Sequence, residues 1–450
     1  MPLEIHSMQD FRGAHFAAQK TGGTMSFDRR EFLKATAAGL AAAGGGALTG
    51  CTATKHAAHV VVIGGGFGGA TAARYLRLGS AGGIDVTLIE RQPGFVSFPM
   101  SNLVIGGAKK LEDISRGYDG LRAHGVRVIH GNAVAIDPVG RGVRLADGSA
   151  LGYDRLVVAP GIDFMWETVP GLTAEAAGPV LHAWQAGAQT TALRKQIEAM
   201  ADGGVFAICI PRTPYRCLAA PYERACLVAH YCKTHKPRAK VLILDANDDV
   251  QAQRGLFMSA WSELYPNLVE YRPNHPISSV DVASKTVRFE FGDAVKADVL
   301  NVVPSQRAGA IARQAGLVTA GNRWCGIDWR TMESLAHPGI HVVGSATLAA
   351  PMMPKSAHMS NQHAKIAAAA IVAPLLGRVP SPEPITIAHA GYSYFDDRNA
   401  AHMMSVHAYD AKLAAYRLVP ESSGVSARRG EAEGKHAWAW AQNLWADTLA

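Results

Sequence analysis

The chain has 450 residues, of which 48% are hydrophobic and 18% are charged. It is therefore long enough for two or three domains, and its composition excludes disordered and fibrous proteins. Its 44 Lys and Arg residues against 37 Asp and Glu give a net charge of +7. These basic residues are scattered and form no run of the kind that marks a nucleic-acid-binding tail, so we expect no nucleic-acid partner.

The first fifty residues have the features of a targeting sequence. Residues 28–34 (DRREFLK) precede an apolar stretch rich in Ala and Gly that ends near Gly50, which is the layout of a twin-arginine export signal. Residues 1–24 show no hydrophobic periodicity, and Met25 would make a natural start. The apolar stretch is shorter than the roughly 20 residues of a spanning helix. We therefore predict a periplasmic protein, exported by the twin-arginine route, with no transmembrane span.

The end of this signal leaves two alternatives open. Residues 48–51 (LTGC) are similar to a bacterial lipobox, in which Cys51 would become the lipid-anchored first residue of the mature chain. Alternatively, the signal simply ends in a segment that contains a cysteine. An acylated terminus would distinguish the two.

A nucleotide-binding pattern follows directly. The apolar, β-branched run His59–Ile63 predicts a strand, a glycine-rich turn follows it, and residues 70–76 predict a helix. The turn matches GxGxxG: the first glycine allows the sharp turn, the second lets the backbone approach a pyrophosphate, and the third permits close helix packing. The next predicted strand ends in an acidic residue that can accept hydrogen bonds from a ribose. The predicted dinucleotide-binding residues are Gly64, Gly66, Gly69 and Glu90.

Two later segments favour FAD over NAD as the dinucleotide. Residues 153–161 (YDRLVVAPG) resemble the "ATG" strand of flavoproteins that have two dinucleotide-type domains, and residues 340–345 (IHVVGS) resemble their final FAD strand. On this basis we add Ala159, Gly161, Gly344 and Ser345 to the predicted FAD-binding residues.

A second nucleotide-type region begins near residue 204. Val205–Ile210 predicts a strand, but residues 211–214 (PRTP) follow it where a glycine-rich phosphate turn would be required. Lys240–Asp245 predicts the next strand and restores the pattern. We therefore expect a Rossmann-like region without an NAD(P)H site, so that electrons leave by another route.

The cysteines beyond the signal show no metal-ligand spacing, and the histidines do not cluster with them in the sequence, so we predict no metal site. Cys209 lies in a predicted strand, and Cys226 and Cys232 lie on a predicted helix, where packing is the expected role. These three and Cys217 and Cys325 make an odd number, so at least one thiol stays unpaired.

At this point the chain resembles the flavoprotein subunit of flavocytochrome c sulfide dehydrogenase, among the sulfide:quinone oxidoreductase relatives of glutathione reductase. The resemblance covers residues 58–450 and is carried by residues 117–125 (GYDGLRAHG), 214–217 (PYRC), 221–224 (PYER), 306–309 (QRAG) and 354–356 (PKS). It implies a periplasmic FAD enzyme that takes two electrons from a small reduced-sulfur substrate and passes them singly to a cytochrome c subunit.

The same resemblance implies the roles of three residues. Cys217 is one member of the family's redox cysteine pair, and Glu223 stands where a nearby glutamate could accept a proton. Cys217 also precedes a helix that we expect to start near Pro221, whose dipole would favour a thiolate. Lys355, with a helix expected from about Asn361, should face the flavin pyrimidine and stabilise negative charge on the reduced ring. The alternatives are a buried packing cysteine and an ordinary surface lysine.

Three positions depart from the family. Gly391 replaces the second redox cysteine, so the flavin-side disulfide cannot form in the family manner. Phe98 stands where some members attach FAD through a cysteine, so we expect non-covalent FAD. Ser345 replaces the usual aspartate after Gly344, which gives the ribityl chain a neutral hydroxyl. Cys325 matches a family cysteine outside the redox pair.

These features predict an α/β protein of the disulfide-reductase architecture, with two Rossmann-like domains and a small C-terminal domain. The expected divisions are 1–57 for the signal and linker, 58–170 with 307–380 for the FAD domain, 171–306 for the second domain, and 381–450 for the C-terminal domain. Three tryptophans at helical spacing near the chain end predict a helix docked on its own domain. Two rival functions remain: a peripheral sulfide:quinone oxidoreductase, and a non-catalytic flavoprotein or partner subunit that lost its chemistry at Gly391.

Overall fold

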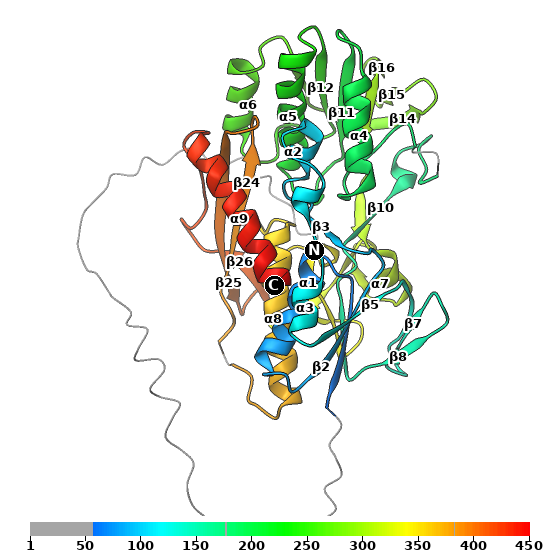
Figure 1. Cartoon of the computed structure of the whole chain (residues 1–450), viewed down its shortest axis with the longest axis vertical. Helices are drawn as coiled ribbons and strands as arrows, with labels where there is room; N and C mark the ends of the chain where they lie inside the picture. The colour runs from blue at the N-terminus through cyan, green and yellow to red at the C-terminus, as the bar shows by residue number, and fades with distance from the viewer. Residues whose placement is uncertain (1–56, 176–177, 382) are drawn as a thin grey trace, which may run out of the picture. The chain divides into compact units, whose positions relative to one another are not determined.

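Two largely parallel β-sheets organise the computed structural model, which describes residues 57–175, 178–381 and 383–450. The predicted export signal and Cys51 lie outside the described residues. Residues 57–450 form one unit of contacts, and its helices and strands are labelled in Figure 1. The mixture of parallel sheets and covering helices confirms the predicted α/β class.

The larger sheet has the strand order β21-β22-β23-β9-β1-β2-β5. Its central strand β1 pairs in parallel with β2 on one side and β9 on the other. Val60, Val61 and Val62 are fully buried, because a central parallel strand is covered on both faces and so reads as a continuous apolar run. Three strands from late in the chain, β21, β22 and β23, complete the sheet, and β23 pairs with β9. The strands are β1 (His59–Ile63), β2 (Asp85–Glu90), β5 (Val126–His130), β9 (Arg155–Val158), β21 (Ile327–Asp328), β22 (Glu333–Ser334) and β23 (Ile340–Val342).

Helices α1 (Phe67–Gly79) and α8 (Ala357–Leu375) pack together beside this sheet (Figure 1). Small residues let them approach: a Cβ on Gly68 would lie 3.6 Å from the Ser360 carbonyl oxygen, and one on Gly79 would lie 3.6 Å from a Val372 methyl carbon. The shorter elements around them are α2 (Ser101–Gly106), α3 (Asp119–Ala123), α7 (Ala310–Gln314), β3 (Phe95–Val96), β4 (Ser115–Arg116), β6 (Ala133–Asp137), β7 (Gly142–Leu145), β8 (Ala150–Gly152), β10 (Ile162–Phe164), β18 (Gln306–Ala308), β19 (Val318–Ala320) and β20 (Trp324–Cys325).

The second sheet has the order β13-β12-β11-β17, with all neighbours parallel. It lies at the top of Figure 1 with helices α4, α5 and α6. Cys209 is buried in its strand β11, and Cys226 and Cys232 are buried on α5, which confirms their predicted packing role. The elements are β11 (Val205–Ile210), β12 (Lys240–Asp245), β13 (Val269–Arg272), β17 (Val299–Val302), α4 (Ala188–Ala199), α5 (Ala220–His235), α6 (Arg254–Glu263), and the strands β14 (Ile277–Asp281), β15 (Thr286–Phe289) and β16 (Val295–Lys296).

The carboxylate at the end of β12 is fully used inside the protein. In a dinucleotide fold this position binds a ribose. Here Asp245 accepts hydrogen bonds from the Tyr222 hydroxyl (2.6 Å), the Tyr271 hydroxyl (3.2 Å) and the Asn247 backbone and side-chain nitrogens (2.9 and 2.7 Å). The turn after β11 has the predicted prolines, with a cis bond between Thr213 and Pro214. This sheet therefore has the Rossmann arrangement of strands, but the carboxylate at the ribose-binding position, Asp245, is hydrogen-bonded to other residues of the protein.

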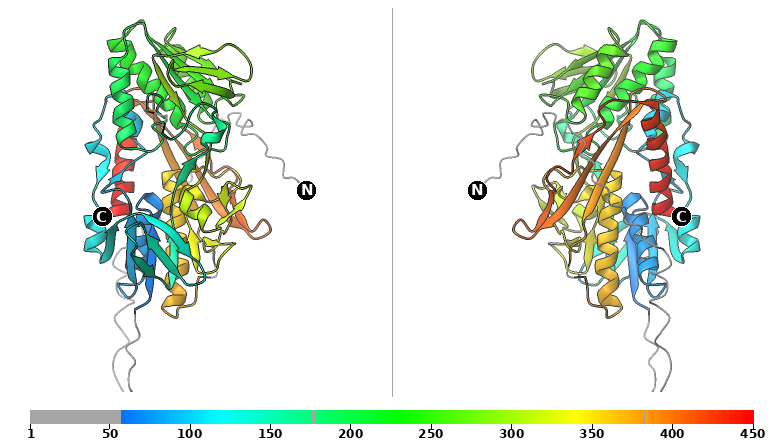
Figure 2. Two further views of the ribbon diagram at one scale, coloured as in Figure 1. Left: turned by 90° about the vertical axis from the view of Figure 1, so that its right-hand side faces the viewer. Right: turned by 90° about the vertical axis from the view of Figure 1, so that its left-hand side faces the viewer.

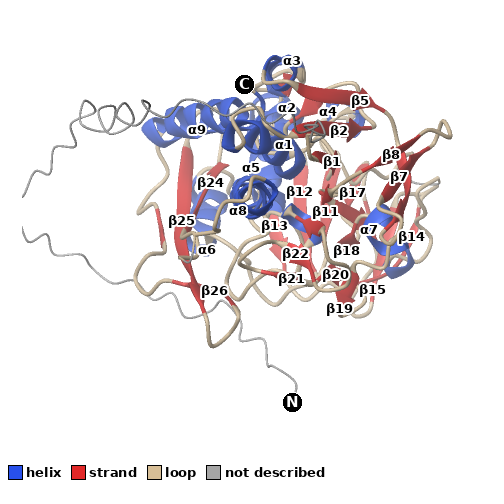
Figure 3. Cartoon of the chain, turned by 90° about the horizontal axis from the view of Figure 1, so that it is seen from below, coloured by secondary structure: helices blue, strands red, loops and turns tan. Residues whose placement is uncertain are grey.

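An antiparallel sheet and helix α9 (Glu431–Leu449) end the chain. The sheet has the order β24-β25-β26, with β27 also paired to β25, and its strands are β24 (Ile387–Tyr394), β25 (Ala400–Asp410), β26 (Ala415–Leu418) and β27 (Gly424–Val425). In the side views of Figure 2 the long strands run beside α8, and Figure 3 shows α9 alongside β24 and β25.

Helix α9 packs against β24 and β25 of its own region, as predicted, and its last turn is also anchored on α1 and α8. The Asp447 carboxylate accepts hydrogen bonds from the Tyr75 hydroxyl on α1 (2.6 Å) and the Asn361 amide on α8 (2.8 Å), and pairs with Lys365 at 2.7 Å. Trp445 is 2% exposed.

Candidate functional site

The turn after β1 has the form that a pyrophosphate requires. Gly64 has a φ of +97°, and a Cβ on Gly69 would lie 1.8 Å from the Gly64 carbonyl oxygen, so both positions demand glycine. Gly66 is exposed, and among the described residues no atom lies within 4 Å of where its Cβ would be. Within the same described set, no side chain caps the N-terminus of α1. Its first N–H groups and positive dipole end are thus available to a phosphate, and the predicted dinucleotide fits the turn.

Glu90 lies at the end of β2, against this turn. Its carboxylate accepts hydrogen bonds from the Gly65 N–H (2.5 Å) and the Gln92 N–H (2.7 Å). Each carboxylate oxygen can accept more than one hydrogen bond, so a ribose could still donate to it. The Tyr118 hydroxyl donates to the Gly65 carbonyl at 3.0 Å, and burial together with the Glu90 charge raises the pKa of Tyr118. Tyr118 belongs to the segment 117–125 that carries the family resemblance, but its contact with the turn was not predicted.

The other predicted FAD residues lie on loops at the carboxyl ends of β9 and β23. The Ala159 N–H donates to the Ile63 carbonyl at 2.8 Å, which places the β9 loop next to the glycine turn. Gly161 has a φ of +66°, and Gly344 has a φ of +78° with the Ser360 hydroxyl oxygen 3.0 Å from where its Cβ would be. Ser345 is 7% exposed. Parallel strands meet their ligands at this edge of the sheet.

Lys355 is a buried lysine, in contrast to the surface alternative. Its ammonium group donates to the carbonyl oxygens of Ser345 (3.3 Å) and Thr347, and lies 3.8 Å from the centre of the Trp324 ring. Burial lowers the pKa of Lys355 to about 7, against the opposite effect of Cys325. The lysine thus changes its charge close to neutral pH.

The helix after Lys355 begins earlier than predicted. We expected it from about Asn361, but α8 begins at Ala357. The physical reason is that the Ser356 hydroxyl accepts a hydrogen bond from the Met359 N–H (3.2 Å) and so caps the first turn. The N-terminus of α8 therefore follows Lys355 directly.

Cys217 lies next to Lys355 through the backbone. Its N–H donates to the Lys355 carbonyl oxygen at 2.9 Å, and its φ of +60° is in the left-handed region, a strained conformation that clusters at functional sites. Helix α5 begins three residues later, at Ala220. Burial raises the pKa of Cys217 to about 11, although Arg216 acts in the opposite direction. The thiol form therefore predominates at neutral pH, whereas we had expected the helix to favour the thiolate.

Glu223 lies on the first turn of α5, 8% exposed. Its carboxylate accepts hydrogen bonds from the Asn102 side chain on α2 (2.7 Å) and from the Tyr394 N–H on the edge strand β24 (2.9 Å). Burial raises the pKa of Glu223 to about 7, and its two hydrogen bonds and Arg224 oppose this shift. A carboxylate with this pKa can both accept and release a proton near neutrality. Asn102 was missed because its partners are far away in the sequence.

Arg216, the neighbour of Cys217 in the chain, packs over Phe98. The Arg216 guanidinium lies 4.4 Å from the centre of the Phe98 ring and donates to the Trp184 carbonyl. Phe98 offers no sulfur for a covalent link. Cys217 and Cys325 are both free thiols, and Cys325 is fully buried in β20, where burial raises its pKa to about 12.

Gly391, the position of the missing second cysteine, lies on β24. A Cβ there would lie 3.1 Å from His389 Cε1 and 3.4 Å from His389 Nε2. Both residues are on the same face of the strand, because side chains two positions apart point the same way. The His389 ring therefore occupies part of the space that a cysteine side chain would need.

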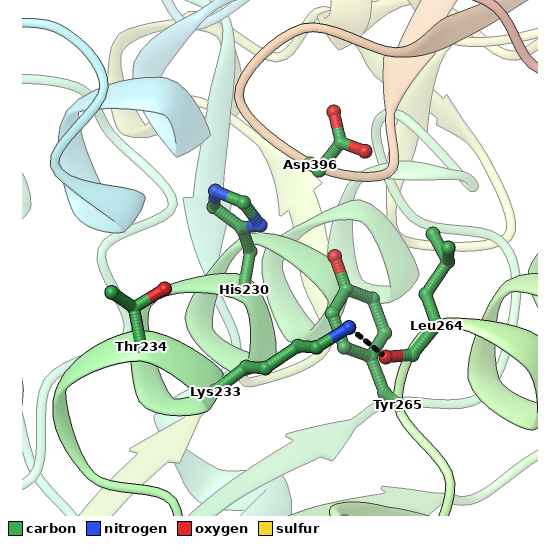
Figure 4. Close-up of a pocket in the computed structure, with 6 residues that line it drawn as sticks. All are labelled: His230, Lys233, Thr234, Leu264, Tyr265 and Asp396. Carbon is green, nitrogen blue, oxygen red and sulfur yellow. Dashed lines mark hydrogen bonds between the residues drawn. The ribbon is translucent and has the colours of Figure 1, made fainter.

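A surface pocket lies elsewhere in the structure. It has a volume of about 350 Å³ and is lined by His230, Lys233, Thr234, Leu264, Tyr265 and Asp396. In Figure 4 the Lys233 ammonium reaches across it to the Leu264 carbonyl oxygen at 3.1 Å. None of the predicted site residues lines it, so it is separate from the candidate site.

Two features are absent from the described part of the chain. Residues 57–175, 178–381 and 383–450 contain no group of three or more His, Cys, Asp or Glu side chains placed to hold a metal ion. In these same segments no helix has both the length and the apolar character needed to cross a membrane.

Three protein-family models match parts of the chain. The model for pyridine nucleotide-disulphide oxidoreductases matches residues 58–199. The central model of the sulfide dehydrogenase (flavocytochrome c) flavoprotein chain matches residues 190–304, and the flavocytochrome c sulphide dehydrogenase flavin-binding model matches residues 386–449.

Curated relatives point the same way. The mitochondrial sulfide:quinone oxidoreductase of Mus musculus is 24% identical over 312 residues, which are 66% of this chain and 67% of that protein. The flavoprotein chain of sulfide dehydrogenase (flavocytochrome c) from Chlorobaculum thiosulfatiphilum is 56% identical over 45 residues, which are 10% of this chain and 92% of that sequence.

Solved structures share the fold. The sulfide:quinone oxidoreductase of Aquifex aeolicus superposes with a TM-score of 0.72 at 21% identity, covering 87% of this chain and 92% of that one. Putidaredoxin reductase in its covalent complex with putidaredoxin gives a TM-score of 0.63 at 19% identity, covering 86% and 93%. The disulfide-reductase architecture is thereby confirmed. The family models and curated relatives together support an FAD-dependent oxidoreductase of the flavocytochrome c sulfide dehydrogenase flavoprotein and sulfide:quinone oxidoreductase-like type.

Proposed function

We propose that this protein is an exported sulfide dehydrogenase that oxidises hydrosulfide at Cys217 and passes the electrons singly to a c-type cytochrome subunit. One observation carries the proposal: the hydrogen bond from the Cys217 N–H to the Lys355 carbonyl. It joins the sulfur-bearing loop to the lysine whose ammonium group holds the Ser345 carbonyl beside the FAD strand. The two family models that match residues 190–304 and 386–449 support the choice of substrate.

The chemistry at Cys217 must work with one cysteine. The thiol and hydrosulfide together form a Cys217 persulfide anion, and this reaction releases two electrons and two protons. Bound FAD would supply the acceptor for the electron pair and one of these protons. The second proton goes to the Glu223 carboxylate, whose pKa of about 7 suits it to receive a proton and release it again. A second hydrosulfide then attacks the outer sulfur, which leaves as a hydropersulfide anion, and the Cys217 thiolate takes up the proton held on Glu223 to restore the thiol.

Arg216 and Lys355 stabilise the negative charges of this cycle. Arg216 is adjacent to Cys217 in the chain and favours the charged form of its sulfur. Lys355 stands near the predicted position of the flavin ring, where a positive charge would stabilise the reduced ring. Because burial lowers the pKa of Lys355 to about 7, negative charge arriving beside it would favour its protonated form.

Anaerobic mixing with sulfide tests this function. We expect the flavin absorbance to bleach rapidly in the wild-type protein and not in a Cys217→Ser variant. Cys232→Ser is the matched control, because Cys232 is a buried thiol on α5, the helix that follows Cys217. Bleaching that persists in Cys217→Ser would contradict the role of Cys217. A flavin that sulfide leaves unchanged in the wild type would favour the non-catalytic alternative.

The electron acceptor needs its own measurement. We expect the sulfide-reduced protein to reduce a c-type cytochrome faster than a soluble ubiquinone analogue. The reverse order would favour the quinone-linked alternative. Export and lipid attachment are tested by locating the protein in cell fractions with and without an Arg29→Lys/Arg30→Lys change, and by mass analysis of residue 51.

A further inference from the structure

Three buried histidines that the proposed function does not use lie where α8 meets the C-terminal sheet. They are His363 on α8, His389 on β24 and His407 on β25, with exposures of 4%, 5% and 0%. We call them the histidine cluster. The strand register pairs Ile387 with His407 and His389 with Ser405, so the two strand histidines lie on the same face of the sheet. His363 interacts electrostatically with His407, and His407 with His389.

The ring nitrogens of this cluster are largely unsatisfied. In the described protein, both ring nitrogens of His363 and the Nδ1 atoms of His389 and His407 have no hydrogen-bond partner. Leaving a buried polar atom unpaired costs about 1–3 kcal/mol. Burial also lowers the pKa values of His363 and His389 to about 3, so these rings are neutral and each needs one donor and one acceptor. Four orphaned nitrogens in one cluster therefore call for small hydrogen-bonding molecules between them.

The cluster has a charged end near the candidate site and a polar end toward the surface. At the first end, Lys355 interacts electrostatically with His363. At the other, His407 Nε2 is 3.0 Å from the Ser405 hydroxyl, and Ser405 is partly exposed. His358, which also interacts with His389, is occupied because its Nδ1 accepts the Ala390 N–H at 2.9 Å. Lys355 and His358 are the titratable groups outside the cluster that interact with its members.

We propose that internal water molecules bridge the histidine cluster into a proton path between Lys355 and the surface at Ser405. A neutral imidazole donates from one nitrogen and accepts at the other, so rings alternating with water can pass a proton along. The path serves the release of electrons. Two-electron-reduced flavin, FADH⁻, becomes FAD when it gives up two electrons and one proton, and two one-electron acceptors take the electrons but not the proton. The role of the path in releasing this proton rests on the proposed single-electron acceptor. The presence of water between the histidines does not depend on that acceptor.

The first test measures proton release without sulfide or cytochrome. The flavin is reduced stoichiometrically with dithionite and reoxidised with ferricyanide in weakly buffered solution containing a pH-indicator dye. In the wild type, proton release should keep pace with the recovery of flavin absorbance. In His363→Phe and His363→Gln, proton release should lag by about tenfold or more, within the usual range for proton-transfer groups. His341→Gln is the matched control, because His341 is equally buried but hydrogen-bonds to the Thr331 carbonyl outside the cluster.

The two variants separate a proton path from a packing role. Phe preserves the ring that packs edge-on against Trp329, with ring centres 5.5 Å apart in the wild type. Gln keeps hydrogen-bonding capacity but cannot take up and release a proton. Wild-type proton release in His363→Gln would overturn the proposal, since it would show that only hydrogen bonding is needed. A flavin that no longer bleaches with sulfide would leave this test intact.

The second test is a crystal structure, which stands even if the variants fold poorly. We expect ordered water within hydrogen-bonding distance of a His363 ring nitrogen and of His407 Nδ1. A dry cluster, or ring nitrogens bonded directly to one another, would overturn the proposal whatever the fate of the proposed function.

Discussion

Two glycines of the nucleotide turn should respond in opposite ways to the same substitution. Gly69→Ala introduces a Cβ that would lie 1.8 Å from the Gly64 carbonyl oxygen, far inside the 3.0 Å below which real Cβ contacts essentially do not occur. Helix α1 or the turn must therefore move by about 1 Å. Gly66→Ala meets no atom of the described protein within 4 Å, and the φ of −71° and ψ of −170° at Gly66 suit alanine as well as glycine.

The magnitudes follow from these distances. Overpacking a rigid site costs about 1–3 kcal/mol, and Gly69→Ala should reach at least the upper end because both clashing partners are backbone. Gly66→Ala should cost less than about 1 kcal/mol of stability, the effect of losing a favoured N-cap residue. Its methyl group instead occupies the space through which a pyrophosphate approaches the backbone. We expect FAD affinity to fall by at least about tenfold, or roughly 1.4 kcal/mol.

The assay combines denaturant unfolding of the FAD-free proteins with FAD titration followed by flavin fluorescence. Gly66→Ala should unfold like the wild type and bind FAD weakly, while Gly69→Ala should be destabilised before any ligand is added. Wild-type FAD affinity in Gly66→Ala, or wild-type stability in Gly69→Ala, would refute the steric account of this turn.

Three further predictions concern the sulfur site. Because the pKa of Glu223 is raised to about 7, the rate of sulfide-dependent flavin reduction should rise through pH 7 more steeply in the wild type than in Glu223→Gln. If stopped-flow measurements give the two proteins parallel profiles of rate against pH, the base is another residue. The folded-state pKa of Lys355 is lowered to about 7. Between about pH 7 and 10 the unfolded chain therefore binds a proton that the FAD-free folded chain does not. Over this range the unfolding free energy of the wild type should rise with pH, relative to that of Lys355→Met, by up to about 1.4 kcal/mol per pH unit. Denaturation titrations that show equal slopes would contradict this. Finally, Gly391→Cys alone should keep its added thiol titratable after oxidation, because the His389 ring lies 3.1 Å from the position of the new Cβ. The double variant Gly391→Cys/His389→Ala should instead lose two titratable thiols, because the new cysteine forms a disulfide with Cys217. Identical thiol counts in both variants would rule out this steric block.

Local patterns predicted the nucleotide turn well. A glycine with positive φ or a forbidden Cβ reflects geometry within a few residues, so Gly64 and Gly69 could be identified from spacing alone. Gly66 was identified by its place between them in the motif. Strand β1, which leads into the turn, is buried on both faces, and its uninterrupted apolar run predicted it. The start of α8 was placed four residues too late because the capping role of Ser356 was overlooked, although a serine is a common N-cap residue.

Features that depend on tertiary packing were not predictable in this way. The partner of Asn102, the Glu223 carboxylate, is 121 positions further along the chain, and a lone polar residue in a short apolar helix does not name its partner. The histidine cluster brings together one helix and two strands, and its members have no common spacing in the sequence. The raised pKa of Cys217 has the same origin, because burial by distant segments outweighs the charge next to it.

The anchoring of α9 has a consequence for the order in which the molecule assembles. The Asp447 carboxylate joins α1, which follows the first strand, to α8. The Tyr75 hydroxyl on α1 therefore donates its hydrogen bond to a residue 372 positions later in the chain. A growing chain therefore cannot finish its nucleotide-binding half until nearly all of residues 57–450 have left the ribosome. FAD would be loaded late, onto an almost complete polypeptide, and export of a folded protein, as we propose, would have to be delayed until that moment.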